Sequence, residues 1–581
     1  RTVTPAPLWY SCVHLDHALL FQGLLMTHKV HPILAGAATL LLSASLTWAG
    51  ESTPAAPAFS ETAYRAHIER LSSDEFEGRA PGTEGEKKAL AYIEQQFRAA
   101  GLQPGIGDSF LQPVPVVEIT THPDDTMPIR GAKGSTALRY GDDLVVWTRQ
   151  PVAESRVDDA ELVFAGYGIV APEYDWNDYA GLDMRGKIAV VLVNDPGFAT
   201  QDPKLFTGNA MTYYGRWTYK YEEAVRQGAA GLFVVHETKA AGYPWEVVRN
   251  GSASQIDLRI DDYARQRLPL EGWMTQDAAQ RVLALAGEDY EQLKRAASGR
   301  KFRPRPLGVK ASVGVRNEVK FSTTYNVVGV LPGSKRPDEY FLYTAHWDHL
   351  GQTAGADDSH VDTIFNGASD NATGIAALIE LGRVFAATKP RPERSVMFVA
   401  VTAEESGLLG SQHFAENPPA PVANMAGGLN MDNLYAIGKT RDITVIGYGA
   451  SELDDYLRRA AAKQQRVLVQ EPSPEKGFYY RSDHFNLAKH GVPMLYTKAG
   501  IDSPTKGAEY GRAWLDDYVA NRYHKPSDEY DAAWDVGGTL QDIELYYDVG
   551  LAVANESGWP NWREGSEFRA VRDVSRAAAV R

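Results

Sequence analysis

From about residue 320 onward, short apolar runs alternate with amphipathic segments, and this alternation restricts the fold more than any other feature. Residues 326–330, 340–345 and 394–403 have the composition of strands, whereas residues 374–387 and 408–416 have helical periodicity. Such alternation predicts a mostly parallel sheet with helices on both faces. We therefore expect an α/β fold for this part of the chain.

Acidic and histidine-containing clusters lie at the ends of these strands and helices. In open α/β sheets, groups at the carboxyl ends of the strands converge on one cleft. A single His or Asp at such a position is usually structural, but together these clusters include two histidines and at least three carboxylates, the ligands that two zinc ions need. The clusters are His346-Trp-Asp348, Ser369-Asp-Asn371, Glu404-Glu405, Asp432 and His524.

The composition excludes several classes of protein. A chain of 581 residues is expected to hold two or three folded units. Its net charge of −15 disfavours a nucleic-acid-binding protein, which needs a basic surface. Cys12 is the single cysteine, so the chain has neither an internal disulfide nor a thiolate zinc site, and any transition-metal site must use His, Asp and Glu.

The N-terminal segment has the pattern of a secretory signal peptide over residues 26–49. Its apolar run, residues 33–46, is about 14 residues long, short of the ~20 that span a bilayer. We expect residues 1–25 to reflect start-site choice and residues 50–58 to be a linker. The protein would then be secreted or periplasmic, without stable membrane insertion after signal cleavage; the alternative is an uncleaved membrane anchor.

The middle of the chain differs from its flanks. Residues 59–125 begin with two predicted helices, the second opened by a capping-box pattern at Thr83 and Glu86. Residues 130–310 contain buried-strand runs but no cluster of His, Asp and Glu at ligand spacing. We expect an inserted, non-catalytic lobe at 130–310, hereafter the insert, between two parts of one catalytic domain. The second part would cover residues 312–560 and carry the active site, followed by a C-terminal tail at 561–581.

Several strings of this sequence resemble a family of co-catalytic zinc peptidases that includes bacterial leucyl aminopeptidases, glutamate carboxypeptidase and the transferrin receptor ectodomain. The resemblance covers residues 59–125 and 312–555, and the insert resembles a mainly-β protease-associated (PA) domain. The matching strings are Thr344-Ala-His-Trp-Asp-His-Leu-Gly351, Gly367-Ala-Ser-Asp-Asn-Ala-Thr-Gly374, Ala403-Glu-Glu-Ser-Gly-Leu-Leu-Gly-Ser411, Asn430-Met-Asp432, Ser482-Asp-His-Phe485 and Tyr523-His524.

The resemblance implies a role for each of these residues. His346 and Asp432 would bind one Zn²⁺, Glu405 and His524 the second, and Asp370 would bridge both. The resemblance also implies that the bond between Asp370 and the next residue is a cis peptide.

Three further residues would act around the two zinc ions. Glu404 would be the general base toward a zinc-bridging water that attacks the peptide bond. Asp348 would orient the imidazole of His346. Tyr480 is a weaker candidate for contacting the oxyanion, since simple packing also explains a tyrosine there.

The leading interpretation is an exported aminopeptidase that acts on peptide or protein substrates. A carboxypeptidase, or a hydrolase of another amide, on the same two-zinc centre is the alternative among enzymes. Arg481 is the one candidate from sequence for binding a free carboxylate. A non-catalytic, receptor-like binding protein is the alternative outside enzymes, and the complete ligand set argues against it.

Overall fold

The computed structural model describes residues 58–353 and 361–579, which belong to one compact unit beginning at residue 57. The expected signal peptide, the residues before it and nearly all of the expected linker lie outside these described residues. Within the described ranges, no helix is both long enough and apolar enough to cross a membrane.

A mostly parallel sheet forms the centre of the second half of the chain, as predicted. Strand β14 lies between β17 and β18 and is parallel to both, and β21 continues the parallel order beyond β18. Strand β13 borders β17 in the antiparallel direction. The bounds are β13 (Arg305–Leu331), β14 (Arg336–His346), β17 (Arg394–Val401), β18 (Met425–Asn430) and β21 (Met494–Ala499).

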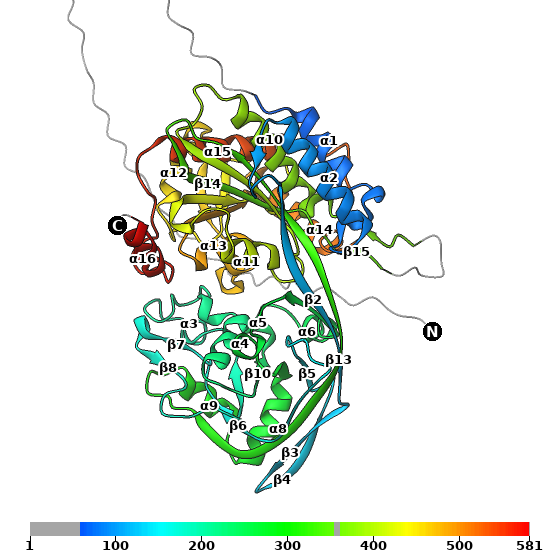
Figure 1. The fold of residues 1–581 in the computed structure, drawn as a ribbon. Helices are drawn as coiled ribbons and strands as arrows, with labels where there is room; N and C mark the ends of the chain where they lie inside the picture. Colours follow the sequence, from blue (N-terminus) through cyan, green and yellow to red (C-terminus); the bar gives the residue numbers. More distant parts are fainter. Residues whose placement is uncertain (1–57, 354–360, 580–581) are drawn as a thin grey trace, which may run out of the picture. The chain divides into compact units, whose positions relative to one another are not determined.

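Successive side chains of these strands enter two different cores, which places helices on both faces of the sheet (Figure 1). Phe341 and Tyr343 of β14 pack in one core, whereas Leu342 packs in the other. The first core is covered by α1 (Glu61–Leu71), α2 (Glu84–Ala99), α10 (Thr373–Ala387), α12 (Leu453–Lys463) and α15 (Gly537–Asn555), the second by α11 (Leu409–Glu416) and α13 (His484–Lys489).

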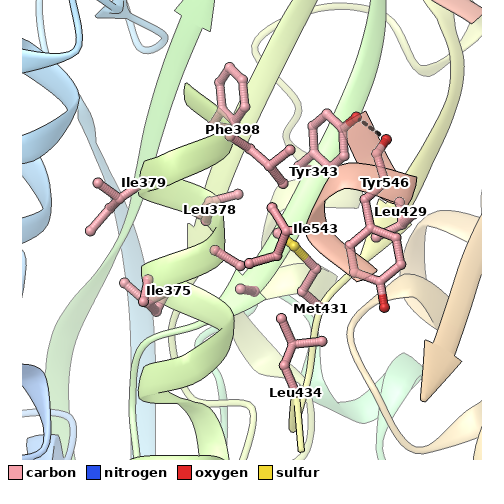
Figure 2. Packing of buried hydrophobic residues seen from close by; sticks show 14 of the residues in the cluster. Tyr343, Ile375, Leu378, Ile379, Phe398, Leu429, Met431, Leu434, Ile543 and Tyr546 are labelled. Carbon is pink, nitrogen blue, oxygen red and sulfur yellow. Dashed lines mark hydrogen bonds between the residues drawn. The ribbon is translucent and has the colours of Figure 1, made fainter. Parts of the chain in front are cut away.

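The first core is built from aromatic and branched side chains that interlock beside α10 (Figure 2). The rings of Tyr343 and Phe398 stack with centroids 5.7 Å apart. The Tyr343 hydroxyl is buried, and it donates a 2.7 Å hydrogen bond to the carbonyl of Tyr546. Burial of this polar group is therefore compensated, and α15 is fixed against the sheet.

Helix α2 begins as the capping pattern predicts. The Thr83 hydroxyl accepts a hydrogen bond from the amide of Glu86. The Glu86 carboxylate accepts from the amide of Gly82 and from the hydroxyl of Thr324 on β13. The cap therefore satisfies one free amide of the helix start, and the Glu86 side chain links the helix to the sheet.

The insert is joined to the rest of the chain by two long strands. Strand β2 (Leu111–Pro123) pairs antiparallel with β13 from Leu111 opposite Val327 to Pro123 opposite Val315. Strand β13 pairs with β6 (Glu154–Phe164) at its start and with β17 at its end, so it runs without a break through the expected boundary near residue 311. Two hydrophobic cores consist entirely of residues between 127 and 315.

Strands and helices both occur in the insert. Its central strands β9, β10 and β12 run parallel, with α4 and α8 among the helices beside them. This composition is more mixed than the mainly-β domain expected there. The bounds are β9 (Ile188–Leu192), β10 (Gly231–His236), β12 (Leu270–Thr275), α4 (Trp217–Arg226) and α8 (Gln276–Ala286).

The segment expected to be a C-terminal tail is folded against the body. Trp562 is fully buried, and its indole donates a 3.0 Å hydrogen bond to the carbonyl of Gly491. Helix α16 (Arg569–Ala579) follows, and its Arg572 is buried as well. The last residues described therefore contribute to the packing of this half of the chain.

A buried arginine from the N-terminal segment connects three loops. The guanidinium of Arg79 donates to the carbonyls of Leu71, Trp347, Asn366 and Gly367 at 2.6–3.0 Å. Trp347 lies between two candidate site residues, and Gly367 lies three residues before another. The first helices are thereby attached to the loops that carry the candidate site.

Candidate metal centre

The first candidate metal cluster consists of three side chains from different parts of the sheet edge. His346 is the last residue of β14, Asp370 precedes α10, and Asp432 follows β18. The Nε2 atom of His346 lies 3.2 Å from Asp370 Oδ1 and 3.9 Å from Asp432 Oδ1. All three side chains are buried, and their ligand atoms lie close enough together to hold one metal ion.

The second cluster shares Asp370 and gathers two histidines around Glu405. The Nε2 atom of His524 lies 3.3 Å from Asp370 Oδ2 and 3.1 Å from Glu405 Oε2. The three residues of this cluster whose ligand atoms lie close enough together to hold a metal ion are His349, Asp370 and Glu405, and His349 Nδ1 lies 2.6 Å from Glu405 Oε1. His524 is the ligand that the family resemblance implies, whereas His349 contacts Glu405 through Nδ1 and, within the described ranges, keeps its Nε2 free as a further nitrogen donor. Asp370 alone offers an oxygen to each cluster.

The chemistry of these donors fits transition-metal ions. The Nδ1 atom of His346 is held by the backbone carbonyl of Asp348 at 3.1 Å, which leaves the Nε2 lone pair directed at the two carboxylates. Among the described residues, the Nε2 atoms of His346 and His349 are buried without a hydrogen-bond partner. Zinc prefers imidazole nitrogens and carboxylate oxygens as ligands. A buried imidazole nitrogen that lacks a hydrogen-bond partner is available to bind such an ion.

Charge in the cluster is arranged for cations. Burial lowers the pKa of His524, but hydrogen bonds to Asp370 and Glu405 outweigh it and raise the pKa to about 10. Burial and Asp370 raise the pKa of Glu405, but the hydrogen bond from His349 brings it down to about 2. Glu405 therefore stays ionised at neutral pH and His524 keeps its proton in the absence of metal, so a metal ion that binds there would displace that proton.

Glu404 lies beside the clusters without joining either. Its carboxyl is within electrostatic reach of His346 and Asp432, and burial, followed by neighbouring carboxylates, raises its pKa well above the usual range. The backbone amides of Glu404 and Glu405 both donate to Asp348, at 3.1 and 3.4 Å. Asp348 thus holds the Glu404–Glu405 backbone, while its carboxylate lies 3.9 Å from the His346 ring.

The loop that carries Asp370 is held by a second carboxylate. Asp528 accepts hydrogen bonds from the amides of Ser369 and Asp370 at 3.0–3.2 Å. The bond between Asp370 and Asn371 is a cis peptide, as the family resemblance implied. Gly367 has a positive φ, and a Cβ there would lie 2.2 Å from the carbonyl oxygen of Asp370, so only glycine fits.

Asp432 is oriented by a chain of hydrogen bonds. Its Oδ2 accepts from the hydroxyl of Ser482 at 2.6 Å and from that of Tyr496 at 3.2 Å. Asn430 donates to Ser482 at 2.7 Å and in turn accepts from Thr344 at 2.6 Å. The other oxygen, Oδ1, lies 3.9 Å from His346 Nε2, and it also has Asn433 Nδ2 at 3.4 Å and Lys498 Nζ at 3.6 Å. The network on Oδ2 therefore orients the carboxylate so that Oδ1 would face a bound ion.

Ser482→Ala should therefore weaken metal binding by about 10–100-fold at the first cluster, because Asp432 loses the donor that orients it. The zinc dissociation constant, measured by competition with a chromogenic chelator, checks this. Ser72→Ala is a matched control, since that buried hydroxyl donates only to the carbonyl of Ile68 in α1. Equal zinc affinities in both variants would contradict the role of Ser482.

The structure places the candidate tyrosine elsewhere and brings another into reach. The Tyr480 hydroxyl donates to Glu567 at 2.9 Å, and its ring packs against Phe485. Tyr523 instead stacks on His524 with ring centroids 3.9 Å apart, and it is 41% exposed. The part of the side chain that is covered, together with the carboxylates of both clusters, raises the pKa of Tyr523 well above the usual range, so its hydroxyl stays protonated.

The five expected ligand residues thus converge, and four contributors were missed. His349, Ser482 and Tyr523 lie within the strings quoted for the resemblance, and Asp528 lies four residues after His524. The signal for each was its position in or near one of these strings. What the sequence lacked was any indication of which neighbour points toward the ions.

Comparison with known proteins gives the following likenesses. Residues 326–547 match Peptidase family M28. The chain is 34% identical over 115 residues to Aminopeptidase NAALADL1 of Mus musculus, which is 19% of this chain and 14% of that protein. It is 38% identical over 106 residues to a probable zinc metalloprotease of Pyrenophora teres f. teres, which is 18% of this chain and 22% of that protein. The chain thus spans less than a quarter of either relative.

Similar solved structures cover more of the chain at lower identity. The aminopeptidase from Aneurinibacillus sp. strain AM-1 is 20% identical with a TM-score of 0.44, and the match covers 86% of this chain and 95% of that one. BSAP, a zinc aminopeptidase from Bacillus subtilis, is 18% identical with a TM-score of 0.40, covering 88% and 99%.

Proposed function

We propose, from the match of residues 326–547 to Peptidase family M28, that this chain is a two-zinc exopeptidase that removes residues from peptide N-termini. The observation that carries the proposal is the position of Asp370, with one oxygen beside His346 and the other beside His524. A carboxylate shared in this way suits two ions about 3.5–4 Å apart. The names of the relatives support an aminopeptidase over other amide hydrolases.

Each residue of the site would have a separate role. His346, Asp432 and one oxygen of Asp370 would hold one zinc ion, and Glu405, His524 and the other oxygen would hold the second. When bound, two zinc ions polarise a carbonyl and lower the pKa of water. Glu404 would take the proton of the attacking water at its carboxylate and return it to the leaving amine nitrogen.

Tyr523 is our candidate for contacting the developing oxyanion, in place of Tyr480. Its hydroxyl stays protonated and its ring lies on His524, whereas the Tyr480 hydroxyl is engaged by Glu567.

Export of the protein, as secreted or periplasmic, is proposed from the sequence pattern of residues 26–49 alone. A protease-associated identity of the insert is likewise proposed from its sequence alone.

Removal of metal should abolish hydrolysis. We expect about two zinc ions per chain by mass spectrometry, loss of at least ~10²-fold in activity after dialysis against a chelator, and recovery on adding zinc. A protein that stays fully active without bound metal would overturn the two-zinc proposal.

Substrate polarity is tested with one peptide in two forms. An aminopeptidase should release the first residue from an unblocked peptide and leave the N-acetylated peptide intact. Release of the last residue from the N-acetylated peptide would establish a carboxypeptidase instead. Full zinc occupancy without hydrolysis of any peptide or amide would point to a binding protein.

A further inference from the structure

Two arginines line one pocket of about 320 Å³ where the insert meets the segment before Ser482. Arg216 precedes helix α4 of the insert, and Arg481 follows the short helix Phe478–Tyr480. The pocket wall is otherwise largely aromatic, with Trp147, Trp217, Tyr243 and Trp273 among its lining residues. An apolar pocket with convergent polar groups is the usual form of a small-ligand site.

Neither guanidinium has a counter-charge in the part of the chain that the structure describes. Arg216 Nε and Arg481 Nε and Nη2 are buried without a hydrogen-bond partner. Burial lowers the pKa of Arg216 to about 10, and the neighbouring Arg481 contributes to that shift. Both side chains are partly buried. Two like charges in such positions are costly without an anion, since arginines removed from water are ordinarily paired with carboxylates.

Aromatic contacts hold Arg481 without neutralising it. Its guanidinium lies over the rings of Tyr243 at 5.7 Å and Phe478 at 5.5 Å. Such contacts restrain the planar group and leave its N–H groups able to donate to a carboxylate in a bidentate manner. The pocket is therefore preorganised for a planar anion.

The pocket adjoins the metal centre. Arg481 directly precedes Ser482, which donates to the ligand Asp432. Tyr523 acts electrostatically on Arg481, and its ring stacks on that of the ligand His524. One short molecule could therefore place an anionic group in the pocket and a peptide bond at the metal centre.

We propose that Arg216 and Arg481 bind the free α-carboxylate of a short peptide substrate, with its last side chain against the aromatic wall. The inference rests on the proposed peptidase function and extends it to a substrate class, namely peptides of a few residues with a free C-terminus. The insert would thereby select substrate length, because it supplies Arg216. The planar guanidinium of arginine can bind a carboxylate through two parallel hydrogen bonds, which is the geometry that this site requires.

The test compares one tripeptide as its free acid and as its C-terminal amide. Wild-type enzyme should hydrolyse the acid with a kcat/KM about 10–100-fold above that of the amide, the range expected for charged hydrogen bonds. Arg216→Met should bring this ratio close to one, and Arg216→Lys should give an intermediate ratio. Arg249→Met is the matched control, since this exposed arginine lies on the neighbouring helix Trp245–Asn250 outside the pocket lining, and it should keep the wild-type ratio.

Two failures are distinguishable. Equal hydrolysis of acid and amide by wild type would overturn the carboxylate site and leave the peptidase proposal standing. If neither peptide is hydrolysed, the peptidase proposal fails. Calorimetric titration with the same two peptides then tests whether the pocket binds a carboxylate. Tighter binding of the acid to wild type than to Arg216→Met would then support it, and equal binding would overturn it.

Discussion

Glu404→Gln should lower kcat by about 10²–10⁴-fold, at the upper end of that range, while both zinc ions stay bound. Glutamine keeps the shape of the side chain but cannot accept a proton at neutral pH. Glu404 would serve both when water attacks and when the amine leaves, so both halves of the reaction lose their proton carrier. Burial raises the pKa of this carboxyl, which helps it to keep the proton between the two steps.

Glu405→Gln is the matched comparison, because the two residues adjoin and their amides are held by the same Asp348. Glu405 lies 3.1 Å from His524 and is bonded to His349, so its replacement should weaken one zinc site. Added zinc should then restore part of the activity. Zinc content and turnover are measured for both variants. If Glu404→Gln loses zinc and Glu405→Gln keeps both ions, the two roles are reversed.

Arg79→Met should destabilise the fold by about 4 kcal/mol or more. Its guanidinium satisfies four backbone carbonyls, and each buried acceptor left without a donor costs about 1–3 kcal/mol. That loss is a large part of the ~5–15 kcal/mol that stabilises an ordinary domain. Since two of the carbonyls belong to Trp347 and Gly367, the variant should also bind zinc more weakly.

Denaturant unfolding of zinc-free protein measures the effect on the fold. Arg70→Met is the control from the same segment, because Arg70 is 47% exposed and pairs with an equally exposed Glu75. Exposed pairs of this kind contribute about 0–1 kcal/mol. Unfolding midpoints that coincide for the two variants would contradict the role assigned to Arg79.

The class of fold and five of the side chains that converge at the candidate metal centre could be predicted from the sequence. Alternating apolar runs and amphipathic helices require a layered α/β arrangement, because each apolar face must be covered. His346 and Asp432 both follow parallel strands, whose carboxyl ends meet at one edge of the sheet, so their convergence followed from order along the chain. The start of α2 was also predictable, because the cap at Thr83 depends on residues three positions apart.

Which residues contact the candidate ligands could be learned only from the folded structure. Ser482, His349 and Asp528 contact Asp432, Glu405 and the Asp370 loop across long separations in sequence, and such contacts depend on side-chain direction rather than on spacing. The sequence alone did not distinguish Tyr480 from Tyr523 as the tyrosine near the metal centre. In the structure the Tyr480 hydroxyl donates to Glu567, whereas the Tyr523 ring stacks on His524. Nothing in the sequence marked Arg216 as a candidate site residue. An arginine without a counter-charge can be recognised only when its neighbours are known, and these depend on how the chain packs.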